Sequence, residues 1–188
     1  LWGVRQITVA HDPLTWLPDG NPLSYAFDEI DENIGGTGQI NILIETDKTD
    51  GIKQLKLLQA IEQFEQYMYK YVDPIKDEKV ITNIFSIIDI AKETNRALHN
   101  NNPEWYRLAE NDQAMANLLF LFENAGPEQL RRMTTNDFSI SQMTIRVKWL
   151  DAHRYGPLTD YVKKGLNTYL APYTTKVRAT GSVYTIFS

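Results

Sequence analysis

The stretch that decides the fold is QINILIETD at residues 39–47, followed by GIKQLKLLQAIEQFEQYM at residues 51–68. Isoleucine occupies every second position from 40 to 44, which is the period of a half-buried strand. In the second part, apolar side chains recur every three or four positions as far as Val72. This period predicts a helix over residues 53–72, ending before Pro74, so the pair forms the start of a βαβ unit.

The same kinds of element return further along the chain. KVITNIF at residues 79–85 predicts the strand that completes the first βαβ unit. Residues 139–150 alternate apolar and polar side chains, which predicts another half-buried strand. An amphipathic helix over residues 157–171 and a last strand near KVRATG, residues 176–181, complete a second βαβ unit.

The segment between the two units has a different character. Ser86 and Asp89 form an S-x-x-D capping pattern that predicts the start of a helix reaching Leu98. HNNNP ends that helix, and residues 112–124 predict another helix that is apolar nearly all round. The segment is therefore a helical insertion.

The element order predicts an α+β protein of the ferredoxin-like, split βαβ type, with two helices on one face of the sheet. Residues 1–34 would be an extended lead-in, residues 35–85 the first half, and residues 139–188 the second half. Residues 86–138 would be the helical insertion of about 50 residues, which must pack against a sheet edge or build a lobe of its own.

The glycines in IGGTG, residues 34–38, predict a turn rather than a phosphate-binding loop. A nucleotide fingerprint places its glycines after a strand and before a helix, whereas these glycines precede a strand. The spacing is not G-x-G-x-x-G, and no Gly-Lys-Ser/Thr follows.

Composition and motifs argue against several classes of function. A net charge of −5 with scattered Lys and Arg argues against a nucleic-acid partner. The chain has no cysteine, which removes disulfides, thiolate nucleophiles and cysteine-based zinc sites. His11, His99 and His153 do not have metal-ligand spacing, so we expect them on loops or on the surface. We expect no enzyme, no cofactor, and no catalytic, cofactor-binding or metal-binding residues.

The helix AMANLLFLF, residues 114–122, has two interpretations. It is either a core helix of the insertion or an apolar surface that meets lipid, an apolar substrate or a partner subunit. In the second interpretation, Met115, Phe120 and Phe122 would suit an adaptable apolar groove.

The order of several loose motifs resembles the first large extracytoplasmic loop of resistance–nodulation–division (RND) exporters. The closest branch is that of the bacterial hydrophobe exporters, related to MmpL and Patched-like proteins. There, a D-x-x-x-W-x-P segment, a Gly-Gly turn, a helix with paired leucines, a capped helix start and a final Thr-Gly follow one another. The matching residues here are Asp12, Trp16, Pro18, Gly35, Gly36, Leu57, Leu58, Ser86, Asp89, Lys92, Thr180 and Gly181.

The resemblance implies transport rather than catalysis. The parent protein would be a proton-driven exporter of lipids or other hydrophobic molecules, and this chain would be its porter domain on the periplasmic side of the bacterial inner membrane. Its partners would be the hydrophobic substrate, the membrane helices of the parent chain and further copies in a homo-oligomer. The proton-relay residues would lie in those membrane helices, and no substrate-lining residue carries over to this chain.

Two other hypotheses remain open from the sequence. A free-standing ferredoxin-like ligand-binding or sensory module would hold its ligand in a closed pocket. A small enzyme without a recognisable motif would show a cleft with strongly shifted carboxylates or histidine.

Overall fold

The computed structural model describes residues 36–181, so the lead-in predicted over residues 1–34 lies outside the described part. These residues form an α+β structure around one four-stranded sheet of order β2-β3-β1-β4, in which every neighbouring pair is antiparallel. The strands are β1 (Gly38–Glu45), β2 (Ile81–Phe85), β3 (Ile140–Val147) and β4 (Lys176–Thr180).

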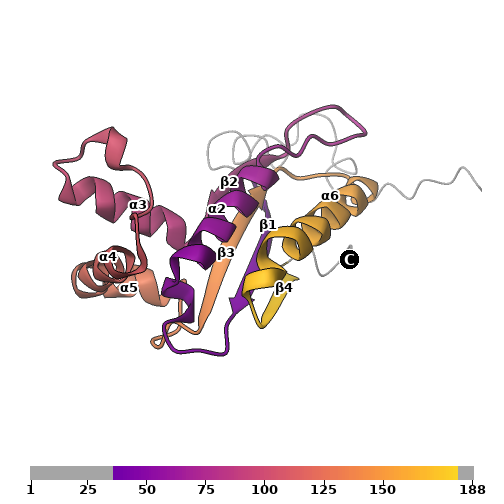
Figure 1. Cartoon of the computed structure of the whole chain (residues 1–188). Helices are drawn as coiled ribbons and strands as arrows, with labels where there is room; N and C mark the ends of the chain where they lie inside the picture. Colours follow the sequence, from indigo (N-terminus) through magenta and orange to yellow (C-terminus); the bar gives the residue numbers. More distant parts are fainter. Residues whose placement is uncertain (1–35, 182–188) are drawn as a thin grey trace, which may run out of the picture.

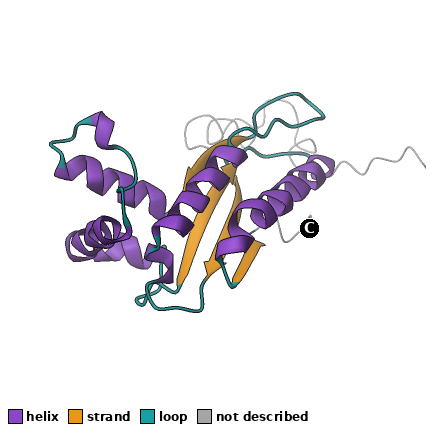
Figure 2. Cartoon of the chain, in the orientation of Figure 1, coloured by secondary structure: helices purple, strands orange, loops and turns teal. Residues whose placement is uncertain are grey.

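Helices α2 (Leu55–Met68) and α6 (Ala152–Gly165) connect strands that are not neighbours in the sheet. Helix α2 joins β1 to β2, although β3 lies between them, and α6 joins β3 to β4, although β1 lies between them. Figures 1 and 2 show both helices lying across the same face of the sheet.

The alternation predicted for the central strands is confirmed. Ile40, Ile42 and Ile44 of β1 are at most 1% exposed and face the helices, because every second side chain of a strand points to the same face. On the opposite face, the side-chain oxygen Oδ1 of Asn41 accepts hydrogen bonds from Gln39 Nε2 at 2.7 Å and Thr144 Oγ at 3.1 Å. The sheet therefore has one apolar face against the helices and an opposite face on which polar side chains lie beside Leu43 and Phe85.

Two predicted helix boundaries are wrong. Helix α2 ends at Met68, four residues before Val72, which is 40% exposed. After Met68 the backbone forms tighter turns, with Lys70 N–H donating to the Tyr67 carbonyl and Tyr71 N–H to the Met68 carbonyl. Asp73 then enters the interior and bonds to Arg154. Helix α6 begins at Ala152, well before residue 157, and continues through Pro157.

The additional turn of α6 has a specific anchor. Its Tyr155 hydroxyl accepts a hydrogen bond from the Leu150 backbone N–H at 3.0 Å, and its Arg154 bonds to two carboxylates. These contacts compensate for the backbone hydrogen bond that a proline inside a helix removes.

The insertion contains α3 (Ile87–Leu98), α4 (Asp112–Ala125) and α5 (Pro127–Arg131), which lie to the left of the sheet in Figure 1. The predicted capping box at Ser86 is confirmed, with Ile88 N–H donating to its hydroxyl and its own N–H donating to Asp89. The buried side chains of the insertion, such as Met115, are continuous with the core under the sheet. The insertion thus shares its core with the sheet.

Glycines with positive φ lie where the chain enters β1 and where it leaves β4. Gly36 has φ of 98°, and a Cβ there would lie 2.4 Å from the Val147 carbonyl oxygen. Gly181 has φ of 112°, and a Cβ there would lie 2.6 Å from the Gln39 carbonyl oxygen. The turn predicted at Gly36 is confirmed, and Gly35 lies outside the described residues. Because β1 and β4 are antiparallel neighbours, the entry and the exit lie close together.

Candidate functional site

Helix α4 has one buried and one exposed face, so the core interpretation of AMANLLFLF describes only part of the helix. Met115 and Leu119 are fully buried, whereas Phe120 is 60% and Leu121 is 47% exposed. The helix therefore anchors the insertion in the core with one face and presents apolar side chains to solvent with the other.

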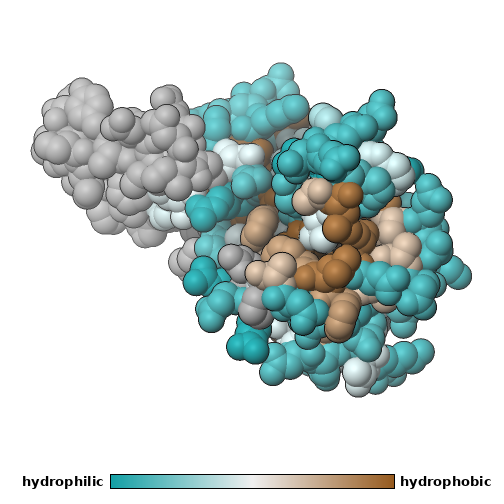
Figure 3. Space-filling view, turned by 90° about the vertical axis from the view of Figure 1, so that its left-hand side faces the viewer, coloured by the Kyte–Doolittle hydropathy of each residue, from teal (hydrophilic) through white to brown (hydrophobic). Residues whose placement is uncertain are grey.

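The exposed face of α4 borders a groove of about 360 Å³, within the range of about 300–1,000 Å³ common for ligand pockets. Figure 3 shows the corresponding face of the molecule, with a hydrophobic patch (brown) surrounded by hydrophilic side chains (teal). We call this hollow the α3–α4 groove. It is lined by Asn95, Leu98, His99, Trp105, Arg107, Leu108, Ala109, Glu110, Asn111, Ala114, Asn117, Leu118 and Leu121.

The sequence HNNNP shapes one end of the groove. Asn100 and Asn101 have φ of 55° and 59°, a left-handed conformation that asparagine adopts more readily than most residues. The side chain of Asn102 then accepts a hydrogen bond from Glu104 N–H at 3.0 Å and caps the short turn Pro103–Trp105. The chain thereby doubles back after α3.

This reversal places Trp105 flat against His99, with ring centroids 3.5 Å apart and an angle of 3° between the planes. Hydrogen bonds hold the stacked pair. His99 Nδ1 lies 2.8 Å from the Asn95 carbonyl oxygen, and Asn95 Nδ2 donates to the Arg107 carbonyl oxygen at 2.9 Å. Since Asn95 is buried, this end of the groove is fixed to α3 from inside.

Arg107 is the cation at this end. Its guanidinium lies 4.6 Å from the centre of the Trp105 ring and pairs with Glu110 at 3.3 Å. Both members of the ion pair are largely exposed, so water weakens their attraction. Arg107 can therefore turn toward a polar group at the rim of the groove.

The side chains of the groove combine an apolar floor with a polar rim. The floor is aliphatic, with Leu98, Leu118 and Leu121, and the rim carries amide, imidazole and guanidinium groups. Such a surface fits a molecule with an apolar body and a polar end.

Some residues singled out from sequence lie elsewhere. Met115 is in the core, Phe122 is half-buried against the core, and Phe120 is exposed but outside the groove lining. His153 is exposed on α6, whereas His11 lies outside the described residues.

The sequence predicts a loop or surface position for His99, and no sequence pattern singles out Leu98 or Trp105 as site residues. The available signal was HNNNP, a tight turn between two helices with apolar faces.

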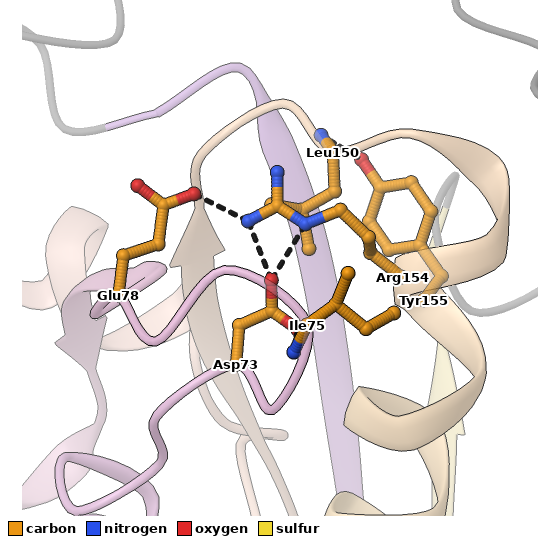
Figure 4. A network of polar contacts seen from close by, with 6 residues as sticks. All are labelled: Asp73, Ile75, Glu78, Leu150, Arg154 and Tyr155. Carbon is orange, nitrogen blue, oxygen red and sulfur yellow. Dashed lines mark hydrogen bonds and ion pairs between the residues drawn. The ribbon is translucent and has the colours of Figure 1, made fainter.

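A second polar cluster ties the loop between α2 and β2 to α6. Arg154, only 3% exposed, bonds to Asp73 at 2.6 Å through its Nε and also pairs with Glu78 (Figure 4). Asp73 is fully buried and also accepts a hydrogen bond from the Ile75 N–H at 3.2 Å. Each charged group of this cluster is paired with another member of the cluster, so we interpret the cluster as structural.

Two further features of residues 36–181 concern metal binding and membrane insertion. Within that range, histidine and acidic side chains nowhere gather in groups of three that could hold a metal ion. The helices of that range are all too short or too polar to cross a bilayer.

Comparisons with known proteins give no relative on which to base a function. The chain matches no protein-family model, and no curated protein is similar enough to it to count as a match.

Proposed function

We propose that this chain is the extracytoplasmic porter domain of a proton-driven RND-type exporter, acting on the periplasmic side of a bacterial inner membrane. In this proposal the α3–α4 groove receives a lipid or another hydrophobic molecule, or passes it on. The membrane helices of the parent chain and further copies in a homo-oligomer would be its partners, and the domain itself would catalyse no reaction.

The sheet supports the finer fold assignment within this proposal. An order of β2-β3-β1-β4, with α2 and α6 as the crossovers, is the order expected of two interleaved split βαβ units. We therefore propose a ferredoxin-like fold with α3–α5 inserted between its halves. A fold of this kind serves many functions, so it limits the proposal only weakly.

The positions of entry and exit also support it. Gly36 lies two residues before β1 and Gly181 directly follows β4, and these neighbouring strands run in opposite directions. When the chain enters and leaves a domain at neighbouring positions, the domain can be inserted between two consecutive membrane helices without stretching either connection.

The observation that carries the proposal is the open apolar groove. Leu98 is 54% and Leu121 is 47% exposed beside it, so the apolar floor continues onto the surface. Such a site suits a molecule in transit between neighbouring domains. A free-standing binding module, the alternative, would enclose its ligand, and the α3–α4 groove does not.

The first test concerns the parent reading frame. We expect a membrane helix close to each end of this segment when hydropathy is averaged over a window of about 19 residues. Start and stop codons close to both ends would overturn the exporter proposal and favour the free-standing module.

The second test concerns the groove in the full-length protein. Leu121→Asp places a charge on the apolar floor, so cells should retain more of a fluorescent hydrophobic dye while the membrane level of the protein stays unchanged. The matched control is Ile75→Asp, because Ile75 is 49% exposed but lies in the loop between α2 and β2. Equal dye retention in both variants would contradict a role for the groove.

A further inference from the structure

A buried carboxylate lies where the insertion joins the sheet layer. Glu65, on the inner face of α2, is 8% exposed. Its Oε1 accepts a hydrogen bond of 2.5 Å from the hydroxyl of Ser86. Ser86 is the residue that connects β2 to α3 and caps the start of α3. Glu65 therefore contacts the insertion at the point where the chain enters it.

The surroundings of Glu65 are poor in free positive charge. Asp89, from the first turn of α3, already accepts hydrogen bonds from Ser86 N–H at 2.9 Å and the Tyr106 hydroxyl at 3.4 Å. Two cations of α3 lie near the Tyr106 ring: Lys92 pairs with Glu62 of α2, and Arg96 pairs with Glu93. The Tyr69 hydroxyl accepts a hydrogen bond from Ile84 N–H at 3.0 Å.

This environment disfavours the ionised form of Glu65. Burial raises the pKa of Glu65 from 4.5 to about 7, the Ser86 hydrogen bond opposes that rise, and the charge of Asp89 adds to it. Lys92 lowers the pKa of Glu65 and Glu62 raises it, each more weakly. The neutral acid can still accept the Ser86 hydrogen bond through its carbonyl oxygen.

We propose that Glu65 is a proton-operated contact between α2 and the start of α3. Ionisation strengthens the single hydrogen bond from Ser86 but places a charge in a buried site, so the closed arrangement is favoured when Glu65 is neutral and opens more readily when Glu65 is ionised. The energetic direction follows from linkage. The folded state binds the proton more tightly than an opened state does, so the stabilisation is complete below the opened-state pKa. It is lost as the pH rises through the folded-state pKa.

The contact has a consequence for the α3–α4 groove. Asn95 and Leu98 in the last turn of α3, and His99 directly after it, line the groove, and Ser86 caps the same helix at its start. A shift of α3 on α2 therefore moves one wall of the groove. The proton-operated contact stands on its own geometry, and only its effect on a bound hydrophobic molecule rests on the proposed function.

The experiment measures the titration of Glu65 and the opening of α3 separately. Carbon-13 NMR of the side-chain carboxyl should give a midpoint near 7, rather than near 4.5. Hydrogen exchange, corrected for the intrinsic effect of pH, should show α3 opening roughly 25-fold more at about pH 8 than at about pH 5.5. That factor follows from a pKa of about 7 in the closed state and 4.5 in the opened state.

Glu65→Gln keeps the hydrogen-bond acceptor and removes the charge, so it should abolish the pH dependence of α3 opening. Glu93→Gln is the control, because it removes a largely exposed carboxylate on α3 and should leave that dependence unchanged. If Glu65→Gln fails to fold, the wild-type carboxyl titration decides alone. A midpoint near 4.5, or identical pH dependence in wild type and Glu65→Gln, would overturn the inference.

The failure of the proposed function would look different. Binding of 1-anilinonaphthalene-8-sulfonate to the groove should weaken as α3 opens if the groove takes hydrophobic molecules. If this dye does not bind while Glu65 still titrates as expected, the result would contradict the role of the groove in binding hydrophobic molecules. The proton-operated contact at Glu65 would not be affected.

Discussion

The sheet layer and the insertion use apolar residues in different ways. Under the sheet, Ile40, Ile42 and Met143 are fully buried, and the other sheet face carries polar side chains together with Phe85, which is 49% exposed. In the insertion, Leu98 and Phe120 are more than half exposed, although the two regions share one core. The central strands therefore bury their core-facing apolar side chains completely, whereas α3 and α4 leave some of their apolar side chains exposed.

The largest expected effect on stability comes from removing the buried ion pair between Arg154 and Asp73. Arg154→Met leaves the buried Asp73 without its cation, so the free energy of unfolding should fall by about 3–5 kcal/mol. Urea denaturation measures this loss. The control is Arg178→Met, because Arg178 pairs with Glu45 at the surface and its loss should cost about 0–1 kcal/mol. Equal losses in the two variants would show that the Arg154 cluster does not hold α6 to the loop.

The next effect concerns the packing of α6 on α2. A Cβ at Gly165 would lie 2.6 Å from Tyr67 Cε1 and 2.8 Å from Phe64 Cε2, so Gly165→Ala should cost about 1–3 kcal/mol.

Gly156 lies in the same helix, and apart from its two chain neighbours a Cβ there would meet nothing within 4 Å. Alanine favours helix, but its Cβ at this position would crowd the ring of Pro157, which follows in the chain. Gly156→Ala should therefore change the stability by less than Gly165→Ala does. Thermal unfolding of both variants tests the pair, and an equal loss in the two variants would contradict this account of α6.

A smaller effect tests the joint between the two regions. Helix α2 has no side-chain cap from its own N-cap residue, and Asp112 of α4 accepts the Leu55 N–H at 2.7 Å instead. Asp112→Ala should therefore cost about 1 kcal/mol. Glu128→Ala, which removes an exposed first-turn acid from α5, should cost less than half as much in the same chemical denaturation experiment. No measurable difference would mean that the cap does not tie α4 to α2.

The smallest effect concerns the apolar surface of the insertion. Phe120 is 60% exposed, so Phe120→Asp should change the free energy of unfolding by no more than about 0.5 kcal/mol. The neighbouring Leu119 is fully buried, and Leu119→Ala should cost about 2–5 kcal/mol. A large loss in Phe120→Asp would place that side chain in the core and remove the contrast between the regions.

Sequence patterns predicted the elements of the sheet layer well, because their burial is set by local periodicity. The alternation at 40–44 and the capping pattern at Ser86 each match the structure. Helix ends were predicted less well. The apolar period continues to Val72, but the regular helix ends at Met68, ahead of the buried Asp73–Arg154 pair, whose members lie 81 residues apart.

The α3–α4 groove could be predicted only in part, since it depends on how two helices and a turn meet. The pattern AMANLLFLF predicts a candidate apolar surface, but it does not show which of its side chains face inward. The placement of Trp105 on His99 required two left-handed asparagines and the bond from Asn95 to the Arg107 carbonyl. None of these contacts is visible in a residue pattern.

The neighbouring entry and exit points have a mechanical consequence. Asn41 of β1 pairs with Thr180 of β4, close to the positions where the chain enters and leaves the sheet. If the two attachments were pulled apart, the force would peel β4 from the sheet edge and break its hydrogen bonds one pair at a time. Strands loaded in this way yield at low force, whereas strands pulled lengthwise resist with all their bonds together. A flanking structure that moved could therefore detach β4 first and leave β1, β2 and β3 paired.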